Sequence, residues 1–182
     1  MKIISLVPSI TETLFDFGLT ENEVIGRTKF CIHPENEVKN VAVIGGTKNL
    51  NIENVISLNP DLIIANKEEN EKLQVEEFQK NFKVWVTDIQ NLEDNERFIS
   101  DVGNLLNKEK LALEFNENIN EIFKNTSQKV KVAYIIWRNP YMTIGSDTFI
   151  HEILEKLGFE NIFKNRKRYP EISLNQMTSA DY

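Results

Sequence analysis

Short apolar runs and longer amphipathic segments alternate along the first half of the chain. Apolar runs of this kind are typical of strands buried on both faces, and the amphipathic segments between them are typical of helices that cover a sheet. Their alternation predicts an α/β fold built on a parallel sheet with right-handed crossovers. The expected strands span residues 3–7, 23–26, 41–44, 61–65 and 82–87, and the expected helices span residues 10–17, 52–58 and 72–79.

Start and stop signals frame the first expected helix. Pro8 closes the first apolar run, and Ser9 with Glu12 has the spacing of a capping box, in which each side chain satisfies a free backbone amide of the first turn. Gly18 follows the last apolar residue and predicts the end of the helix.

The pattern changes after residue 91. Residues 92–106 predict one helix, Asn107 is expected to cap the next, and residues 108–125 predict a second helix without Gly or Pro. About 18 helical residues span roughly 27 Å, enough to cross a small domain. We therefore expect this second helix to be a connecting spine between two lobes rather than a cover for the sheet.

The C-terminal part of the chain repeats its opening. An apolar run at residues 130–137 predicts a buried strand, and after a loop a helix at residues 147–157 ends at Gly158. The sequence therefore predicts two Rossmann-like α/β lobes with parallel sheets, joined by a long spine helix. The expected divisions are an N-terminal lobe at 1–91, connecting helices at 92–128 and a C-terminal lobe at 129–182.

The repeat extends to the last residues. Ile52-Glu53-Asn54-Val55 and the later Asp61 align with Leu174-Asn175-Gln176-Met177 and Asp181. Asp61 opens an expected core strand, so Asp181 is expected to open one too, at the point where the sequence stops. We therefore expect an incomplete second lobe, in a chain that is a fragment or a truncated product.

Composition and charge narrow the possible partners. The chain has 182 residues, 21 Lys+Arg against 28 Asp+Glu and a formal net charge of -7, so no nucleic-acid partner is expected, because phosphate-backbone binding needs a basic surface. The single cysteine, Cys31, excludes an intrachain disulfide and a multi-cysteine zinc site. No apolar run has the length of a membrane span. One short basic cluster is expected to be a solvated loop: Lys164, Arg166, Lys167 and Arg168.

The N-terminus sets an expectation for localisation. The apolar run that ends at Pro8 is too short for a secretory signal, and no cleavage site follows it. The chain as written is therefore expected to be cytoplasmic, or to be a chain from which a targeting segment was removed.

Three segments are candidates for ligand binding. In open α/β sheets, ligands lie beyond the carboxyl ends of the strands and at helix N-termini, which places residues 8–11, 27–34 and 137–147 at such a site. Helix capping is the simpler role for Ser9, and core filling is the alternative role for Trp137 and Tyr141. The candidate ligand-binding residues are Pro8, Ser9, Phe30, Cys31, His33, Trp137, Arg138 and Tyr141.

Residues 28–34 hold the densest cluster of reactive side chains. In an extended segment Cys31 and His33 would project on one face, as two metal ligands or a thiolate–imidazole pair would. No metal site is expected, because a metal normally takes three or four protein ligands and His151 is the only other histidine. The simpler roles are a small buried apolar residue for Cys31 and a loop hydrogen-bonding residue for His33. No nucleophile or phosphate-loop motif occurs, so no catalytic residue is expected.

Three segments resemble a known family of transport proteins. At "KIISLVPSITETLFDFG", "NIENVISLNPDLIIA" and "WRNPYMTIGSDTFIHEILEKLGFENIF" the sequence is similar to the substrate-binding proteins of ABC importers for cobalamin and iron chelates. These are the helical-backbone metal receptors of the Fe/B12 periplasmic-binding domain family. The resemblance implies two lobes and one spine helix, an extracytoplasmic location, and a ligand clamped between the lobes without chemical change.

The resemblance also implies a ligand class and a docking partner. A corrinoid of the cobalamin type is the first expectation, with Phe30 near one of the family's corrin-contacting positions, followed by a ferric siderophore or haem. A glutamate on each lobe is implied to engage arginines of an ABC permease. Glu53 stands at the first of these positions and Asn175 at the second, so one docking charge is absent.

Two other functions remain open from the sequence. A cytoplasmic homologue could bind a metal or cofactor without transport, which the absence of a signal sequence and Asn175 favour. A two-lobed nucleotide-sugar enzyme is the third possibility, although the sequence lacks the phosphate loop and catalytic base that such an enzyme needs.

Overall fold

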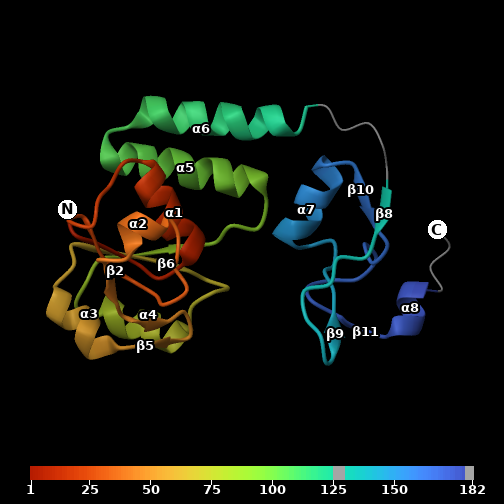
Figure 1. Cartoon of the computed structure of the whole chain (residues 1–182), viewed down its shortest axis with the longest axis horizontal. Helices are drawn as coiled ribbons and strands as arrows, with labels where there is room; N and C mark the ends of the chain where they lie inside the picture. Colours follow the sequence, from red (N-terminus) through yellow and green to blue (C-terminus); the bar gives the residue numbers. More distant parts are fainter. Residues whose placement is uncertain (125–129, 179–182) are drawn as a thin grey trace. The chain divides into compact units, whose positions relative to one another are not determined.

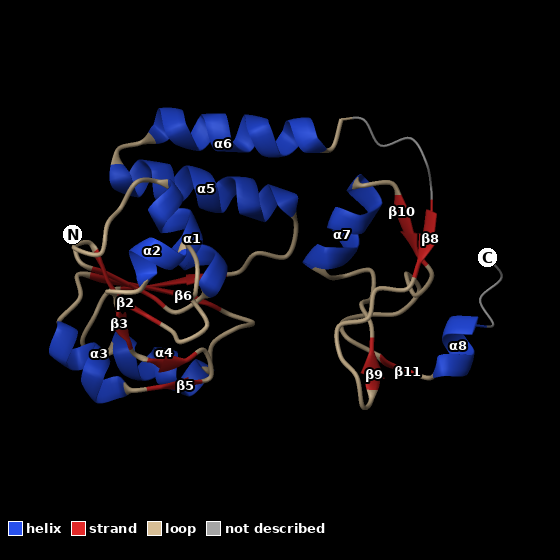
Figure 2. Cartoon of the chain, in the orientation of Figure 1, coloured by secondary structure: helices blue, strands red, loops and turns tan. Residues whose placement is uncertain are grey.

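The computed structural model describes residues 1–124 and 130–178. The chain divides into two compact units, residues 1–88 and residues 89–182, which we call unit 1 and unit 2 (Figure 1). Helices and strands occur in both units (Figure 2).

Unit 1 is built on a five-stranded sheet in the order β3-β2-β1-β6-β7. Every neighbouring pair in this sheet is parallel, as the alternation of apolar runs and helices predicted. The strands are β1 (Ile3–Ser5), β2 (Val24–Arg27), β3 (Ala42–Val43), β6 (Leu62–Asn66) and β7 (Val84–Thr87).

Helices lie on both faces of this sheet. Figure 1 shows α1 on one face and α3 and α4 on the other. The helices of unit 1 are α1 (Pro8–Asp16), α2 (Glu35–Val38), α3 (Ile52–Leu58) and α4 (Lys72–Gln79), and a short antiparallel pair joins β4 (Gly45–Gly46) to β5 (Asn49–Leu50).

The core of unit 1 lies on its central strands. Ile3 and Ile4 of β1 and Ile63 and Ile64 of β6 are 0% exposed, because helices cover both faces. Burying one side chain of this size contributes about 1.5–3 kcal/mol to folding. These two central strands are therefore well packed, and they give the loops that follow them a rigid support.

The start of α1 differs from the predicted capping box. Val7 is the N-cap residue, no side chain caps the helix, and Pro8 occupies the first helical turn. Proline is favoured there because its fixed φ suits a helix and its missing N–H would have no partner. Ser9 lies inside the helix, so the capping-box prediction was wrong. Gly18 has φ 77° and ends the helix region as predicted.

Two antiparallel helices open unit 2, α5 (Leu92–Leu106) and α6 (Glu109–Ile122). Asn107 adopts a left-handed φ of 54° and ends α5, so the prediction that it begins the next helix was wrong. The helices approach closely at Gly103, where an added Cβ would lie 2.5 Å from the Ala112 Cβ. The buried Asn116 amide donates to the Glu96 carbonyl oxygen at 3.1 Å across the same interface.

The rest of unit 2 repeats the strand–helix–strand order of unit 1. Strands β8 (Val130–Val132) and β10 (Phe159–Asn161) pair in parallel, and α7 (Phe149–Lys156) lies between them in sequence. Gly158 has φ 81°, close to the value at Gly18. The remaining elements are β9 (Tyr141–Met142), which pairs antiparallel with β11 (Glu171–Ile172), and α8 (Leu174–Thr178).

The predicted buried strand at residues 130–137 is shorter than expected. Only its first three residues form β8, while Tyr134 is 43% exposed and Trp137 is 63% exposed. In the described part of unit 2, two parallel strands pair where unit 1 has five. The strand predicted to open at Asp181 lies outside the described residues.

Candidate functional site

The loops that follow the parallel strands of unit 1 gather at one edge of its sheet. Carboxyl ends of parallel strands meet at the same edge, which is where ligands bind in open α/β sheets. We call this region the carboxyl edge and define it as residues 8–11, 28–34, 45–48 and 67–70. It contains five of the predicted ligand-binding residues: Pro8, Ser9, Phe30, Cys31 and His33.

Asn70 ties the carboxyl edge to the ends of β1 and β6. Its side-chain amide donates to the Leu6 carbonyl oxygen at 3.2 Å and to the Thr47 carbonyl oxygen at 2.9 Å. Its side-chain oxygen accepts from the Asn66 N–H at 2.9 Å, and the residue is only 7% exposed. No local sequence signal marks Asn70, because its partners lie up to 64 positions away and its surroundings resemble a solvated loop.

Burial alternates within the loop at residues 28–34. Thr28 and Cys31 are 0% exposed, whereas Phe30 is 53% and Ile32 is 59% exposed. His33 is exposed while Cys31 is buried, so the two side chains have different surroundings, and the burial of Cys31 agrees with its simpler role as a small apolar residue. Pro8 is half-buried and Ser9 is exposed.

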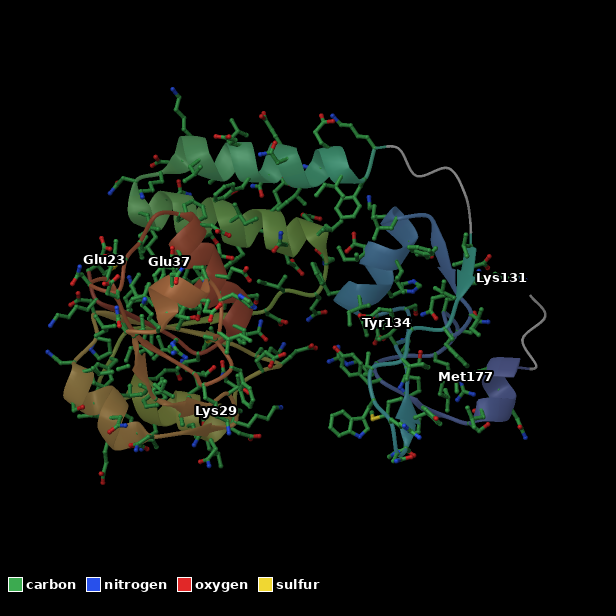
Figure 3. All side chains as sticks on the ribbon, viewed as in Figure 1. Glu23, Lys29, Glu37, Lys131, Tyr134 and Met177 are labelled. Carbon is green, nitrogen blue, oxygen red and sulfur yellow. The ribbon has the colours of Figure 1, made fainter. Side chains whose placement is uncertain are left out.

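Phe30 rests against the β4–β5 pair. An added Cβ on Gly46 would lie 3.3 Å from Phe30 Cε2 and 3.4 Å from Lys29 Cε, so the glycine leaves room for both side chains. The Lys29 ammonium lies 5.1 Å from the centre of the Phe30 ring, within range of a cation–π contact. Figure 3 shows Lys29 projecting from its loop. The carboxyl edge therefore presents an aromatic face with a cation beside it.

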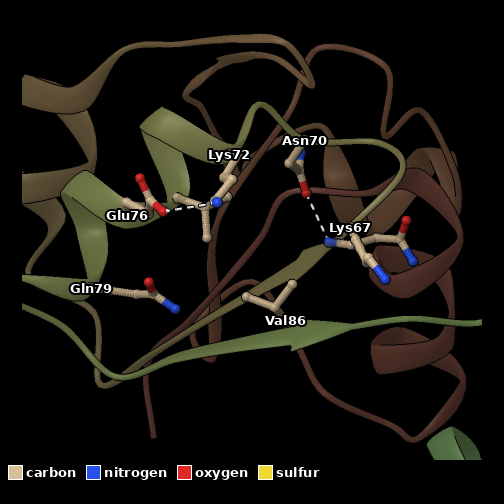
Figure 4. A pocket seen from close by; sticks show the side chains of 8 residues that line it. Lys67, Asn70, Lys72, Glu76, Gln79 and Val86 are labelled. Atoms are coloured by element: carbon tan, nitrogen blue, oxygen red, sulfur yellow. Dashed lines mark hydrogen bonds and ion pairs between the residues drawn. The ribbon is translucent and has the colours of Figure 1, made fainter.

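A pocket of about 400 Å³ lies between α4 and the last strand of the unit 1 sheet (Figure 4). Val75 and Val86 form its apolar lining, and ion pairs of Lys67 with Asp88 at 2.6 Å and of Lys72 with Glu76 at 3.6 Å lie around it. None of its lining residues is among the predicted ligand-binding residues: Asn66, Lys67, Asn70, Lys72, Val75, Glu76, Gln79 and Val86.

Unit 2 presents its aromatic side chains on a tight hairpin. The Met142 N–H donates to the Trp137 carbonyl oxygen at 3.1 Å, and the Ile136 N–H donates to the Met142 carbonyl oxygen at 2.9 Å. Trp137 and Arg138 are exposed and Tyr141 is half-buried, so Trp137 does not fill the core. Tyr134, which Figure 3 labels, is exposed as well and was missed because its apolar neighbours suggested a buried strand.

The two candidate docking residues occupy the same position in their helices. Glu53 is the second residue of α3 and Asn175 is the second residue of α8, and both are exposed. Asn51 caps α3 by accepting from the Asn54 N–H at 3.0 Å, and Gln176 accepts from the Ser173 N–H at 2.9 Å at the start of α8.

The basic cluster of unit 2 is exposed, as predicted, and two nearby carboxylates engage it. Lys164 donates to Glu160 Oε1 at 2.7 Å, and this hydrogen bond raises the pKa of Lys164. The Arg168 backbone N–H donates to the Asp147 carboxylate, and this bond lowers the pKa of Asp147, to which the charges of Arg168 and Lys167 add. The cluster is therefore partly neutralised within the unit.

Within residues 1–124 and 130–178, no three His, Cys, Asp or Glu side chains gather to form a potential metal site. Over the same ranges, no helix combines the length and the apolar character needed to cross a bilayer.

Comparisons with known proteins agree with this architecture. The vitamin B12-binding protein of Vibrio campbellii is 27% identical over 184 residues, covering 97% of this chain and 66% of that protein. An uncharacterised ABC transporter substrate-binding lipoprotein of Bacillus subtilis is 31% identical over 176 residues, covering 88% of this chain and 54% of that protein. The chain thus spans about two thirds of the first relative and about half of the second.

A solved structure and a family assignment extend the agreement. The periplasmic haem-binding protein of Pseudomonas aeruginosa shares the fold, with a TM-score of 0.85, 18% identity, and coverage of 99% of this chain and 68% of that one. This likeness confirms the predicted α/β fold. The family described as periplasmic binding protein matches residues 3–182. The chain belongs to the periplasmic binding protein family, as its sequence motifs suggested.

Proposed function

We propose that this chain captures a metal chelate for an ABC importer and releases it chemically unchanged. The observation that carries the proposal is an exposed aromatic surface on each unit of a periplasmic binding protein fold: Phe30 on unit 1 and Trp137 on unit 2. Exposed apolar side chains lose the stabilisation that burial gives, about 25 cal/mol for each Å². A ligand that covers them recovers this free energy on binding.

A planar macrocycle suits these surfaces. Aromatic rings pack with an offset against flat apolar partners, and a corrin or porphyrin offers such a flat face. Ile32 beside Phe30, and Tyr134 and Ile135 near Trp137, enlarge the exposed apolar surface of each unit.

A corrinoid is the first candidate ligand, and haem or a ferric siderophore is the second. The relative from Vibrio campbellii, a vitamin B12-binding protein, supports the corrinoid. Lys29 supports the second candidate, because an ammonium beside the Phe30 ring attracts the carboxylates of haem more strongly than the neutral amides of a corrinoid.

An ABC permease is the proposed protein partner. Glu53 can form charge-assisted hydrogen bonds with arginine, whereas the neutral amide of Asn175 forms weaker ones. We expect Glu53→Gln to reduce the stimulation of permease ATPase activity more than Asn175→Ala does. Equal effects of the two substitutions would contradict the asymmetric docking. Because relatives are named as periplasmic proteins or lipoproteins, the proposal places capture outside the cytoplasm.

A titration followed by absorbance tests the proposal. Cyanocobalamin, cobinamide, haem and a ferric siderophore are each added to the full gene product at constant protein concentration. We expect one of them to bind stoichiometrically with a Kd below about 10 μM, which corresponds to about -7 kcal/mol. If all four fail to bind in this range, the proposal is wrong.

A second function rests on the same fold without transport. A cytoplasmic homologue that holds a metal or cofactor is favoured by Asn175, which lacks the charge of the expected docking glutamate. This alternative predicts ligand binding without any stimulation of a permease, so the ATPase assay separates it from import. Neither function includes turnover of the ligand.

A further inference from the structure

We propose that the buried side chains of Ser5, Thr11, Thr28 and Cys31 fix the loop that carries Phe30, with Cys31 acting as a positioning residue for ligand binding. We call these four side chains the hydroxyl–thiol cluster. The inference rests on the proposed function, because it assumes that Phe30 contacts the ligand. It gives the buried cysteine a role that differs from ligand contact or metal binding.

The hydroxyl–thiol cluster joins three segments of unit 1. Cys31 Sγ lies 3.0 Å from Thr11 Oγ1 and 3.2 Å from Thr28 Oγ1, and Thr11 Oγ1 lies 2.8 Å from Ser5 Oγ. Thr11 belongs to α1, Ser5 ends β1, and Thr28 and Cys31 lie in the loop after β2. All four residues are 0% exposed, so water does not compete for these hydrogen bonds.

The two loop members of the cluster enclose the ligand-facing residues. Thr28 and Cys31 stand on either side of Lys29 and Phe30, and the Cys31 N–H donates to the Thr28 carbonyl oxygen at 3.1 Å. The Lys29 N–H donates to the Gly45 carbonyl oxygen at 2.7 Å, which holds the loop against the β4–β5 pair. With both ends of this turn anchored, the exposed Phe30 ring has a defined position over Gly46.

A cysteine suits this position because of its size and weak polarity. Its thiol packs as a small apolar group and can still exchange weak hydrogen bonds with neighbouring hydroxyls. Valine would fill the space but leave the buried Thr11 and Thr28 hydroxyls with one partner fewer. Serine would keep a hydrogen-bonding group at the centre of the cluster, so it is the conservative substitution.

Ligand affinity provides the first test. We expect Cys31→Val to weaken binding of the tightest ligand in the titration at least tenfold, and Cys31→Ser to restore most of the affinity. Val55→Ala is the matched control, because Val55 is 0% exposed on α3 and its truncation destabilises unit 1 without touching the loop. Equal affinities for Cys31→Val and the native chain would overturn the inference, as would equal losses for Cys31→Val and Val55→Ala.

The reactivity of the Cys31 thiol provides a test without any ligand. The chain has one cysteine, so the rate of reaction with Ellman's reagent measures how often the loop opens. We expect Thr28→Val to increase this rate at least tenfold over the native chain and over Val55→Ala. A rate for Thr28→Val equal to that of Val55→Ala would show that the cluster does not order the loop.

The two measurements separate the inference from the function on which it rests. If the native chain binds no ligand, the proposed function fails, and the thiol rates alone decide whether the cluster orders the loop. If the native chain binds and Cys31→Val binds equally well, the proposed function stands and the positioning role fails.

Discussion

The two units hold exposed aromatic side chains by different means on related supports. Each contains a parallel strand–helix–strand arrangement whose helix is followed by a left-handed glycine, Gly18 or Gly158. In unit 1, β1 leads directly into α1 at Pro8. Buried side chains beneath the loop after β2 fix Phe30. Unit 2 first inserts a hairpin, whose backbone hydrogen bonds fix Trp137.

This difference shows two ways in which one arrangement can fix an exposed aromatic side chain. A loop anchored by side chains depends on the identity of each buried residue, because few groups of the right size and polarity exist. A hairpin anchored by backbone hydrogen bonds tolerates many side chains, provided that the backbone can still form its bonds. We therefore expect substitutions under the Phe30 loop to affect binding more than substitutions beneath the unit 2 hairpin.

The largest expected effect concerns the cores of the two units. Ile63→Ala, at a fully buried position of the five-stranded sheet, should cost about 2–5 kcal/mol of unfolding free energy. Leu154→Ala on α7, where the side chain is 9% exposed, should lie at the lower end of that range. Urea unfolding followed by circular dichroism measures both. A larger loss for Leu154→Ala would contradict the expectation that the more fully buried side chain, Ile63, contributes more.

The two buried asparagines allow a closer comparison. Asn70 bonds three backbone groups in unit 1, and Asn161 in unit 2 donates to the Ile144 carbonyl oxygen at 2.9 Å and accepts from the Phe163 N–H at 3.0 Å. Asn70→Ala and Asn161→Ala should each cost about 1–3 kcal/mol, because buried backbone groups lose their partners. Only Asn70→Ala should also weaken ligand binding through the carboxyl edge. An unchanged affinity for Asn70→Ala would remove this residue from the site.

The smallest expected effect is a pair of pH dependences of opposite sign. Burial, with the charge of Glu12 adding to it, raises the pKa of Asp16 in unit 1, whereas the Arg168 N–H lowers the pKa of Asp147 in unit 2. Asp16 therefore favours the folded state below its unfolded pKa, and this contribution is lost as the pH rises through its folded pKa. Asp147 contributes above its unfolded pKa and loses that contribution as the pH falls through its lower folded pKa.

Single substitutions test the sign of each contribution to stability. At pH 7, Asp16→Asn should raise the melting temperature slightly and Asp147→Asn should lower it slightly, with both differences shrinking near pH 3. Thermal unfolding at the two pH values is sufficient. If both substitutions change the melting temperature in the same direction at pH 7, the opposite pKa shifts of Asp16 and Asp147 are contradicted.

Elements with complete local signals could be predicted from the sequence. Helices Ile52–Leu58, Lys72–Gln79 and Leu92–Leu106 have the predicted bounds, since their apolar period agrees with their flanking residues. Asn51 and Asn91 cap two of them through their side chains. Errors arose where two signals competed. Pro8 at the first helical position took precedence over the capping signal of Ser9.

The candidate site was less predictable for two physical reasons. Exposed apolar side chains can have the same sequence pattern as those in a buried strand, so the pattern predicted a strand at residues 130–137 that included the exposed Tyr134 and Trp137. Contacts between distant residues leave no local pattern, so neither the Asn70 bridge nor the pocket beside α4 could be predicted. The roles of Phe30, Trp137 and the other predicted ligand-binding residues stay predictions.

The central claim is that the exposed aromatic side chains Phe30 and Trp137 each contribute to the binding of a metal chelate. Calorimetric titration of the tightest ligand into the native chain and into the Phe30→Ala/Trp137→Ala double variant tests it most directly. Leu113→Ala is the matched control, because Leu113 is 60% exposed on α6, outside both surfaces. The account predicts a native Kd below about 10 μM, a loss of at least 100-fold in the double variant, about 2.7 kcal/mol, and no change for Leu113→Ala. Equal affinities for the native chain and the double variant would contradict it.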